Sequence, residues 1–416
     1  MKPHRFLFQF GLCASTLVAA TASNADVSYK LTDLPPPPGN YQNWTQAQSI
    51  NNSGQVIGYV YGAGNHTEGA VWAGGNVQVL PSSSSYYGYP FNAPSAINNG
   101  GVVVGTSYNE AGSANGGPSA YVWVNGSGAA LPRITNGAIS YARGINDANQ
   151  IVGESQTNSG YGAAFPVTWV GGQISLLAVP QGVTGGSTNA INASGTIAGS
   201  VYTVDASNTI VSGSALVWAN SGSIPQALPS NAAVSFATAI NNSGEVAGMA
   251  GNHAALWREG SFIDLGTLAG YSISEALAIN DSGVVVGRSE GILPGTAGSQ
   301  TTAFIWDSTH GMRNLNSLID PSLGWALLYA QGINNNGTIV GLGENAAGAL
   351  HAFELTPVPE PATYTLMAVG LGLIQLGARA SMPLAGRTLG AWRPRRRGAS
   401  APDATAKLRL EIGSPR

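Results

Sequence analysis

The sequence has little charge and almost no cysteine. Only 9% of its 416 residues are charged, and its one cysteine, Cys13, lies near the N-terminus. If an N-terminal leader is removed, the remaining chain has no disulfide and no thiol chemistry. Apolar patterns with the helical period are also nearly missing, whereas 57 glycines separate many short apolar runs. This composition predicts a turn-rich, all-β protein and not a disordered one.

Positive charge is scarce in the body of the chain. Residues 26–378 contain 6 Lys and Arg against 18 Asp and Glu, whereas residues 379–416 contain 9 against 2. Nucleic-acid binding needs a basic face, which an acidic body with scattered cations does not provide. We therefore expect no nucleic-acid partner.

A nine-residue motif, I-N-x-x-G-x-(V/I)-x-G, occurs seven times. Six copies have the first glycine, and the third copy has Asn149 in its place. The spacings between copies are 47, 48, 46, 49, 39 and 54 residues, a period typical of four-stranded propeller blades. The copies begin at Ile50, Ile97, Ile145, Ile191, Ile240, Ile279 and Ile333.

The motif has the chemistry of a tight hairpin. Asparagine is favoured at the first position of a type I turn, and the fifth residue supplies the left-handed conformation that completes a three-residue loop. Asn149 fits, because asparagine tolerates that region best after glycine. The last glycine predicts a bend or a close backbone approach. We assign a structural role to the turn residues Asn51, Asn98, Asn146, Asn192, Asn241, Asn280 and Asn334.

Two further strands recur between the motifs. One ends in tryptophan in six copies and in Leu355 in the last, and the next carries leucines. The last copy lacks its leucine strand, and a matching piece, Tyr29 to Leu34, precedes the first motif. We therefore predict a seven-bladed β-propeller over residues 27–356, closed by the N-terminal strand. The alternative, an open β-solenoid, would need polar capping units at both ends.

Both ends of the chain indicate export. Residues 1–25 have the basic, apolar and small-residue segments of a secretory signal peptide; lipoprotein processing at Cys13 is the weaker alternative. At the other end, Val358, Pro359, Glu360 and Pro361 precede an apolar stretch and then arginines. The prolines predict the end of the last strand and a stiff linker.

This C-terminal order resembles the PEP-CTERM sorting signal of Gram-negative bacteria. The resemblance implies a motif and hydrophobic helix over residues 357–378, transient or lasting inner-membrane anchoring through residues 362–378, and an exosortase-type processing enzyme as partner. Arginines after the helix favour a cytoplasmic C-terminus, and residues 379–416 are expected to form a disordered basic tail. The alternative is a hydrophobic tail of no consequence. The resemblance implies a precursor anchored in the membrane and a mature form at the cell surface or outside the cell.

The repeats resemble bacterial extracellular HAF-repeat proteins over about residues 45–355. The eponymous tripeptide is intact once, as His351-Ala352-Phe353. The resemblance implies the repeat architecture and no particular activity.

Few residues suggest chemistry, so we expect no catalytic, cofactor or metal site. The tryptophans fit blade packing better than a sugar-stacking ring. Asp147 and Asp281 lack the ligand order of a calcium loop, and the glycine-rich Gly182 to Gly186 lacks the lysine of a phosphate loop. The four scattered histidines show no metal-binding spacing; they are His66, His253, His310 and His351.

The resulting hypothesis is an exported propeller that acts as a binding or structural protein, with extracellular polysaccharide as a candidate ligand. The alternative from another class is a polysaccharide-active enzyme, a glycosidase or lyase, that uses acids in long loops between blades. Its longest loops would be residues 288–302 and 202–213. A pair of carboxylates in a pocket would favour the enzyme, an Asn- or Ser-lined end would favour binding, and a pure spacer would bind no ligand.

Overall fold

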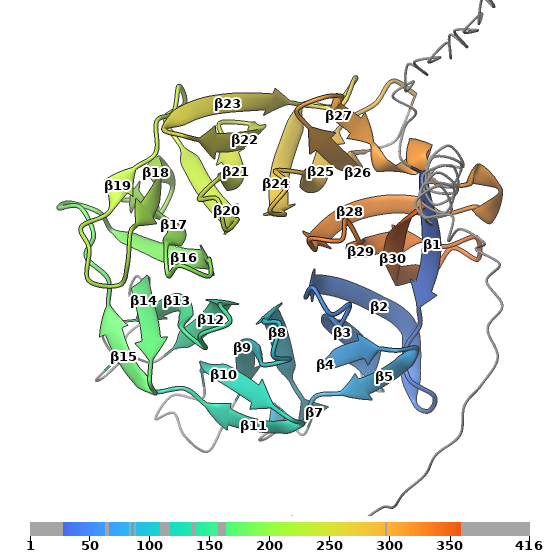
Figure 1. The fold of residues 1–416 in the computed structure, drawn as a ribbon, viewed down its shortest axis with the longest axis horizontal. Coiled ribbons are helices and arrows are strands. Elements are labelled where there is room, and N and C mark those ends of the chain that lie inside the picture. Colours follow the sequence, from blue (N-terminus) through green and yellow to red (C-terminus); the bar gives the residue numbers. More distant parts are fainter. Residues whose placement is uncertain are drawn as a thin grey trace, which may run out of the picture. The chain divides into compact units, whose positions relative to one another are not determined.

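Seven four-stranded antiparallel sheets stand around a central axis (Figure 1). The computed structural model describes residues 28–62, 66–82, 85–86, 89–108, 117–134, 139–156, 164–295 and 298–358. In these ranges the only helices are the short 3-10 turns η1 (Leu315–Leu318) and η2 (Pro321–Leu323). The all-β, seven-bladed propeller is therefore confirmed.

The first four blades follow the chain, each with its innermost strand first. Blade 1 contains β2 (Tyr41–Ile50), β3 (Val56–Gly62), β4 (His66–Ala73) and β5 (Asn76–Val79). Blade 2 contains β8 (Asn92–Ile97), β9 (Val103–Tyr108), β10 (Pro118–Val124) and β11 (Ser127–Ala130). Blade 3 contains β12 (Ser140–Ile145), β13 (Ile151–Gln156), β14 (Ala164–Val170) and β15 (Gln173–Leu176). Blade 4 contains β16 (Gly185–Ile191), β17 (Ile197–Val204), β18 (Ile210–Trp218) and β19 (Gln226–Ala227).

The last three blades continue in the same order, and a two-stranded ribbon precedes blade 2. Blade 5 contains β20 (Ser235–Ile240), β21 (Val246–Ala250), β22 (His253–Arg258) and β23 (Ser261–Gly266). Blade 6 contains β24 (Ile273–Ile279), β25 (Val285–Gly291), β26 (Gln300–Asp307) and β27 (Gly311–Asn314). Blade 7 contains β28 (Ala326–Ile333), β29 (Ile339–Glu344), β30 (Leu350–Val358) and β1 (Ser28–Leu34). The ribbon consists of β6 (Ser85–Tyr86) and β7 (Tyr89–Pro90).

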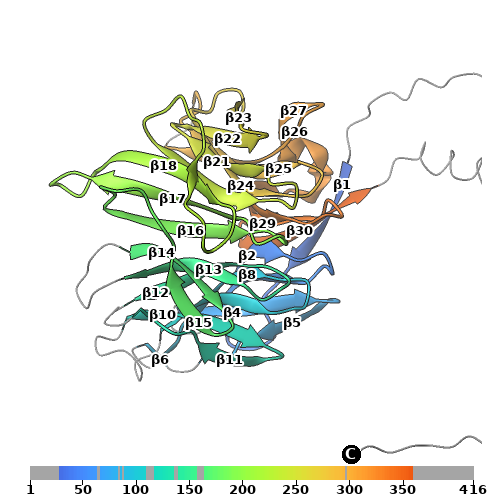
Figure 2. The same cartoon turned by 60° about the vertical axis from the view of Figure 1, so that its left-hand side comes forward.

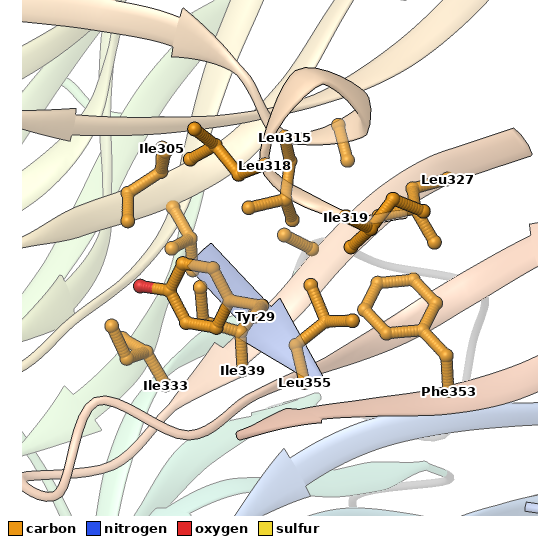
Figure 3. Close-up of a cluster of buried hydrophobic side chains, with 13 residues drawn as sticks. Tyr29, Ile305, Leu315, Leu318, Ile319, Leu327, Ile333, Ile339, Phe353 and Leu355 are labelled. Carbon is orange, nitrogen blue, oxygen red and sulfur yellow. The ribbon is translucent and has the colours of Figure 1, made fainter. Parts of the chain in front are cut away.

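The N-terminal strand closes the ring as its outermost strand in blade 7. β1 pairs with β30 from Ser28 opposite Val358 to Leu34 opposite Ala352. Its Tyr29 is buried beside Leu355 and Ile339, as Figure 3 shows. The two ends of the fold therefore share one sheet and one core, which leaves no open edge between the first and last blades.

The motif turns have the expected backbone. Gly283 has a φ of 74°, and Asn149, its replacement in blade 3, has a φ of 60°. In blade 6 the amide of Gly283 donates to the carbonyl of Asn280 over 3.0 Å. The structure thus has a left-handed residue at this position in all seven turns.

The last glycine of each motif allows a close backbone approach. Opposite it, every innermost strand has a β-bulge, as between Ala276 and Ala278 in blade 6. A Cβ on Gly287 would overlap the carbonyl oxygen of Glu275, and the same overlap would arise at the other six glycines. Glycine is needed here because the bulge brings the inner backbone against it.

The tryptophans hold neighbouring blades together. All six are buried, and the indole N–H of Trp257 donates to the carbonyl of Pro229 in the preceding connection. Trp72, Trp123, Trp169 and Trp218 donate in the same way to Pro35, Pro81, Pro132 and Ala178. They are core residues and do not form a sugar-stacking ring.

Two expectations about connections are wrong. Residues 202–213 and 288–302 do not lie between blades, because each joins the second and third strands of one blade and begins and ends inside those strands. Figure 2 shows the β17–β18 hairpin projecting from the ring. β30 also continues through Pro357 to Val358, since residues 356–358 pair only with β1 and have no neighbour on the β29 side.

The signal peptide, the hydrophobic stretch and the basic tail lie outside the described residues. Of the sorting motif, only Val358 belongs to the described part, at the end of β30. Within the described ranges, no helix has the length and apolar character that crossing a membrane requires.

Candidate ligand-binding channel

The seven innermost strands surround a central channel (Figure 1). Two adjacent cavities lie along it, one at the end formed by the motif turns and one among the innermost strands. One cavity, of about 210 Å³, is lined by the motif turns. The other, of about 450 Å³, is lined by the innermost strands. Both cavities are lined by Ile97, Ile145, Ile191 and Ile279, so the motif isoleucines lie where the two cavities meet.

At the smaller cavity, the motif asparagines form a closed ring of hydrogen bonds. Each side-chain amide donates to the backbone carbonyl of the asparagine in the next blade, over 2.9 to 3.2 Å. The ring closes where Asn334 donates to Asn51 across the two ends of the fold. It thus links every blade to the next.

The same asparagines also hold their own turns. The side-chain oxygen of Asn280 accepts from the amides of Ser282 and Val284, over 3.1 and 3.0 Å. In all seven copies this oxygen accepts from the amide four residues later. Each buried carboxamide therefore has partners for both its oxygen and its nitrogen, which suits a scaffold better than a ligand site.

A second ring lies one residue further along the motif. The side-chain oxygen of Asn52, Asn99, Asp147, Asn242, Asp281 or Asn335 accepts from the backbone amide of the preceding blade. The seventh position is Ala193, whose methyl group accepts nothing, so this ring has one gap. Burial raises the pKa of the Asp281 carboxyl, but hydrogen bonds from Asn242 and Asn335 outweigh burial and leave this pKa below its ordinary value.

At the larger cavity, the bulge of each innermost strand places one extra residue on the channel wall. We call these seven the bulge residues. Their size and polarity vary between blades, whereas the residue after each of them is always Ser, Ala or Gly. The bulge residues are Gln48, Ser95, Arg143, Asn189, Thr238, Leu277 and Gln331.

The bulge residues divide the channel into two halves. In blades 4 and 5, Asn189 donates to the carbonyl of Ala237 over 2.7 Å and Thr238 donates to that of Ala276 over 2.6 Å. Leu277 of blade 6 is apolar. In blades 7, 1 and 2, the side chains of Gln331, Gln48 and Ser95 have no hydrogen-bond partner among the described residues. None of their side-chain polar atoms is buried, so each of them is accessible to solvent or to a ligand.

Arg143 of blade 3 extends this polar half. Its guanidinium lies 2.6 Å from the carboxylate of Glu154 and 5.3 Å from the ring centre of Tyr141. Its side chain is 44% exposed, whereas that of Glu154 is 14% exposed. Burial raises the pKa of the Tyr59 hydroxyl to about 12, and the positive charge of Arg143 opposes part of that effect.

A second ion cluster lies in blade 6. Arg288 contacts Glu275 at 3.1 Å and Glu290 at 3.5 Å, and its guanidinium lies 5.4 Å from the ring centre of Tyr329 in blade 7. Burial lowers the pKa of Arg288, but the two neighbouring groups Glu275 and Tyr329 raise it further than burial lowers it. Both acids therefore have a cationic partner, unlike the acid of a glycosidase pair that must carry a proton.

The histidines occupy separate places and do not form a cluster. His351 lies 2.8 Å from Asp33 of β1 and 2.8 Å from Asn43, so it joins the closing strand to blade 1. His253 pairs with Asp264 at the matching position in blade 5. His66 and His310 pair with Glu68 and Asp307. Within the described ranges, no group of three or more His, Cys, Asp or Glu could hold a metal ion.

The bulge residues are the candidate site residues that the motif analysis missed. The motif begins at the isoleucine, whereas the bulge residue stands two positions before it. A signal was present, because this position varies in size and polarity while the next is always Ser, Ala or Gly. At Gly332 the reason is visible: a Cβ would lie 3.2 Å from the Cα of Ser49 in blade 1.

No protein-family model and no curated protein matches the chain. Solved structures similar to it include the β-propeller domain of the Trilobed protease from Pyrococcus furiosus, at 11% identity and a TM-score of 0.46, covering 76% of this chain and 98% of that one. The Pyrococcus horikoshii acylaminoacyl peptidase is another, at 11% identity and a TM-score of 0.46, covering 78% of this chain and 54% of that one. An Aleuria aurantia lectin in complex with Fucα1-6GlcNAc is a third, at 13% identity and a TM-score of 0.37, covering 67% of this chain and 96% of that one. The chain thus spans about half the length of the peptidase. At these TM-scores the similarities carry no argument about ligand or chemistry.

Proposed function

We propose that this chain is an exported binding protein that takes its ligand into the larger cavity of the central channel. The observation that carries the proposal is the ring of bulge residues. Seven blades repeat the same turn, glycine, isoleucine and small neighbour, yet they place seven side chains of varied size and polarity on this wall. Three of these side chains, Gln331, Gln48 and Ser95, have no hydrogen-bond partner among the described residues and keep their polar groups open to the cavity, where a ligand can reach them.

Export and sorting form the second half of the proposal. The basic and apolar N-terminus and the Pro359-Glu360-Pro361 motif support secretion, membrane anchoring of the precursor and processing by an exosortase-type enzyme. The motif follows β30 directly, so processing there would leave all four strands of blade 7 with the mature protein. The mature form would then act at the cell surface or outside the cell.

We favour binding over catalysis because the acids near the channel already have partners. Glu154 is held by Arg143, Glu275 and Glu290 by Arg288, and Asp281 by amides. The enzymatic alternative predicts that protein recovered from its host releases reducing sugar ends from the host's own extracellular polysaccharide. The binding proposal predicts saturable association with that polysaccharide and no such release.

Intact-mass spectrometry of the protein from surface and medium fractions of its host tests the export half. We expect a chain that begins after residue 22 or 25 and ends near Pro359. A chain that keeps residues 364–416 would contradict sorting, and the polysaccharide titration would still decide whether the propeller binds.

A further inference from the structure

The larger cavity has the size and composition of a site for a small polar ligand. Its volume of about 450 Å³ lies within the range of about 300–1,000 Å³ common for small-molecule sites. The smaller cavity, at about 210 Å³, lies below that range, and the asparagines around it are bonded to one another. Only one end of the channel therefore offers both space and unused hydrogen-bonding groups.

Three unused polar side chains stand next to one another around the channel. Gln331, Gln48 and Ser95 come from blades 7, 1 and 2, which are consecutive because β1 closes the ring. A carboxamide presents both a donor and an acceptor, and a serine hydroxyl does the same. We call these three residues the polar arc. Hydroxyl groups of a ligand, each of which also donates and accepts, match this arc.

The charges at the cavity favour an uncharged ligand. Arg143, in the blade after the arc, has its guanidinium paired with Glu154 at 2.6 Å, so this pair adds no net charge. An anion would have to displace Glu154, whose largely buried carboxylate would then lose its partner. The guanidinium still has N–H groups beyond that contact and can donate to a neutral oxygen.

The opposite wall and the base of the cavity are apolar or satisfied. Leu277 lines the cavity from blade 6. Asn189 and Thr238 already donate hydrogen bonds to backbone carbonyls of the fold. Motif isoleucines such as Ile50 and Ile333 line the base. A ligand that fits must therefore present hydroxyls on one side and C–H groups on another, as the edge and the face of a sugar ring do.

We propose that the polar arc, with Arg143, binds a neutral hexopyranose ring, free or as a residue of a polysaccharide. This inference rests on the proposed binding function and adds the ligand class and the residues. It predicts that Gln331 and Gln48 each contribute one or two hydrogen bonds that the free protein makes only to solvent.

The test is a calorimetric or NMR titration of the full chain with glucose, galactose, mannose and N-acetylglucosamine, each up to tens of millimolar. Glucuronic acid and N-acetylglycinamide serve as the anionic and peptide-like probes. We expect at least one neutral sugar to bind, and each of Gln48→Ala and Gln331→Ala to weaken it on the order of tenfold, as loss of about one hydrogen bond implies. Gln226→Ala, on the exposed outer strand of blade 4, should bind like wild type.

A second variant tests the charge argument. Glu154→Gln removes the partner of Arg143, so we expect it to gain affinity for glucuronic acid that wild type lacks. Equal unfolding midpoints for all variants would show that these changes do not reflect lost folding.

Three results would overturn the inference: no neutral sugar binds, the arc variants bind as well as Gln226→Ala, or N-acetylglycinamide binds better than every sugar. The proposed function is judged separately, by titration with the host's polysaccharide. If the host's polysaccharide binds saturably but no single sugar binds in the cavity, only the inference is contradicted. If the polysaccharide does not bind at all, the proposed function is contradicted.

Discussion

The two ends of the central channel come from the same seven repeats but use their polar side chains in opposite ways. At the turn end, seven identical asparagines bond to one another and to their own turns, and none has a free group. At the bulge end, seven varied residues face a larger cavity, and three have no partner in the described structure. In this repeat protein, the position that has the same residue in all seven blades stabilises the scaffold. The position whose residue type varies between blades lines the surface that can bind a ligand.

The largest expected effect comes from breaking the bulge itself. Gly287→Ala would drive a Cβ into the carbonyl of Glu275 and within 2.9 Å of the Phe304 ring, so the inner strand would have to move. We expect the free energy of unfolding to fall by about 3 kcal/mol, as measured by chemical denaturation. Gly222→Ala is the control, because its Cβ would meet nothing nearer than 3.5 Å. Equal losses in the two variants would refute the close approach.

The next effect separates the two ends directly. Asn192→Ala removes a donor to Asn241 and an acceptor for Ser194 and Thr196 in a buried site. We therefore expect the free energy of unfolding to fall by about 2 kcal/mol. Gln48→Ala at the bulge end should change the free energy of unfolding by less than about 0.5 kcal/mol. If Gln48→Ala destabilised the protein as much as Asn192→Ala, the division into scaffold and binding ends would fail.

Breaking the second ring should lower the free energy of unfolding by a smaller amount. Asn242→Ala removes the acceptor for the Ala193 amide and a donor to Asp281 at an exposed position, and the sequence already tolerates alanine at position 193. We expect a loss of about 0.5 kcal/mol in the same denaturation assay. If the free energy of unfolding fell as much as in Asn192→Ala, both rings would contribute equally to stability.

The smallest effect depends on pH. The folded-state pKa of Asp281 lies below the ordinary 3.8, so its stabilising contribution is present above pH 3.8 and is lost as the pH falls through the folded-state pKa. The stability gap between wild type and Asp281→Asn should therefore narrow below pH 3.8. A gap that widens in acid would contradict the stated hydrogen bonds.

Much of the fold followed from the repeat because each local signal has one structural solution. Asparagine before a left-handed glycine specifies the turn, and the displaced YKLTDL strand specifies ring closure. The hydrogen-bond ring was not predictable, since it depends on how close neighbouring turns lie. The cavity residues were missed for a related reason: a bulge inserts one residue into a strand, and an alternating pattern does not show which side that residue takes.

The most direct test of the account is an NMR titration that follows side-chain amide signals with the neutral sugar that binds best. Asparagines such as Asn192 and Asn280 report the turn end, and Gln48 and Gln331 report the bulge end. The account predicts that both glutamine signals shift with saturation while the ring asparagines stay unchanged. Shifts confined to the ring asparagines would place the ligand at the wrong end of the channel and contradict it.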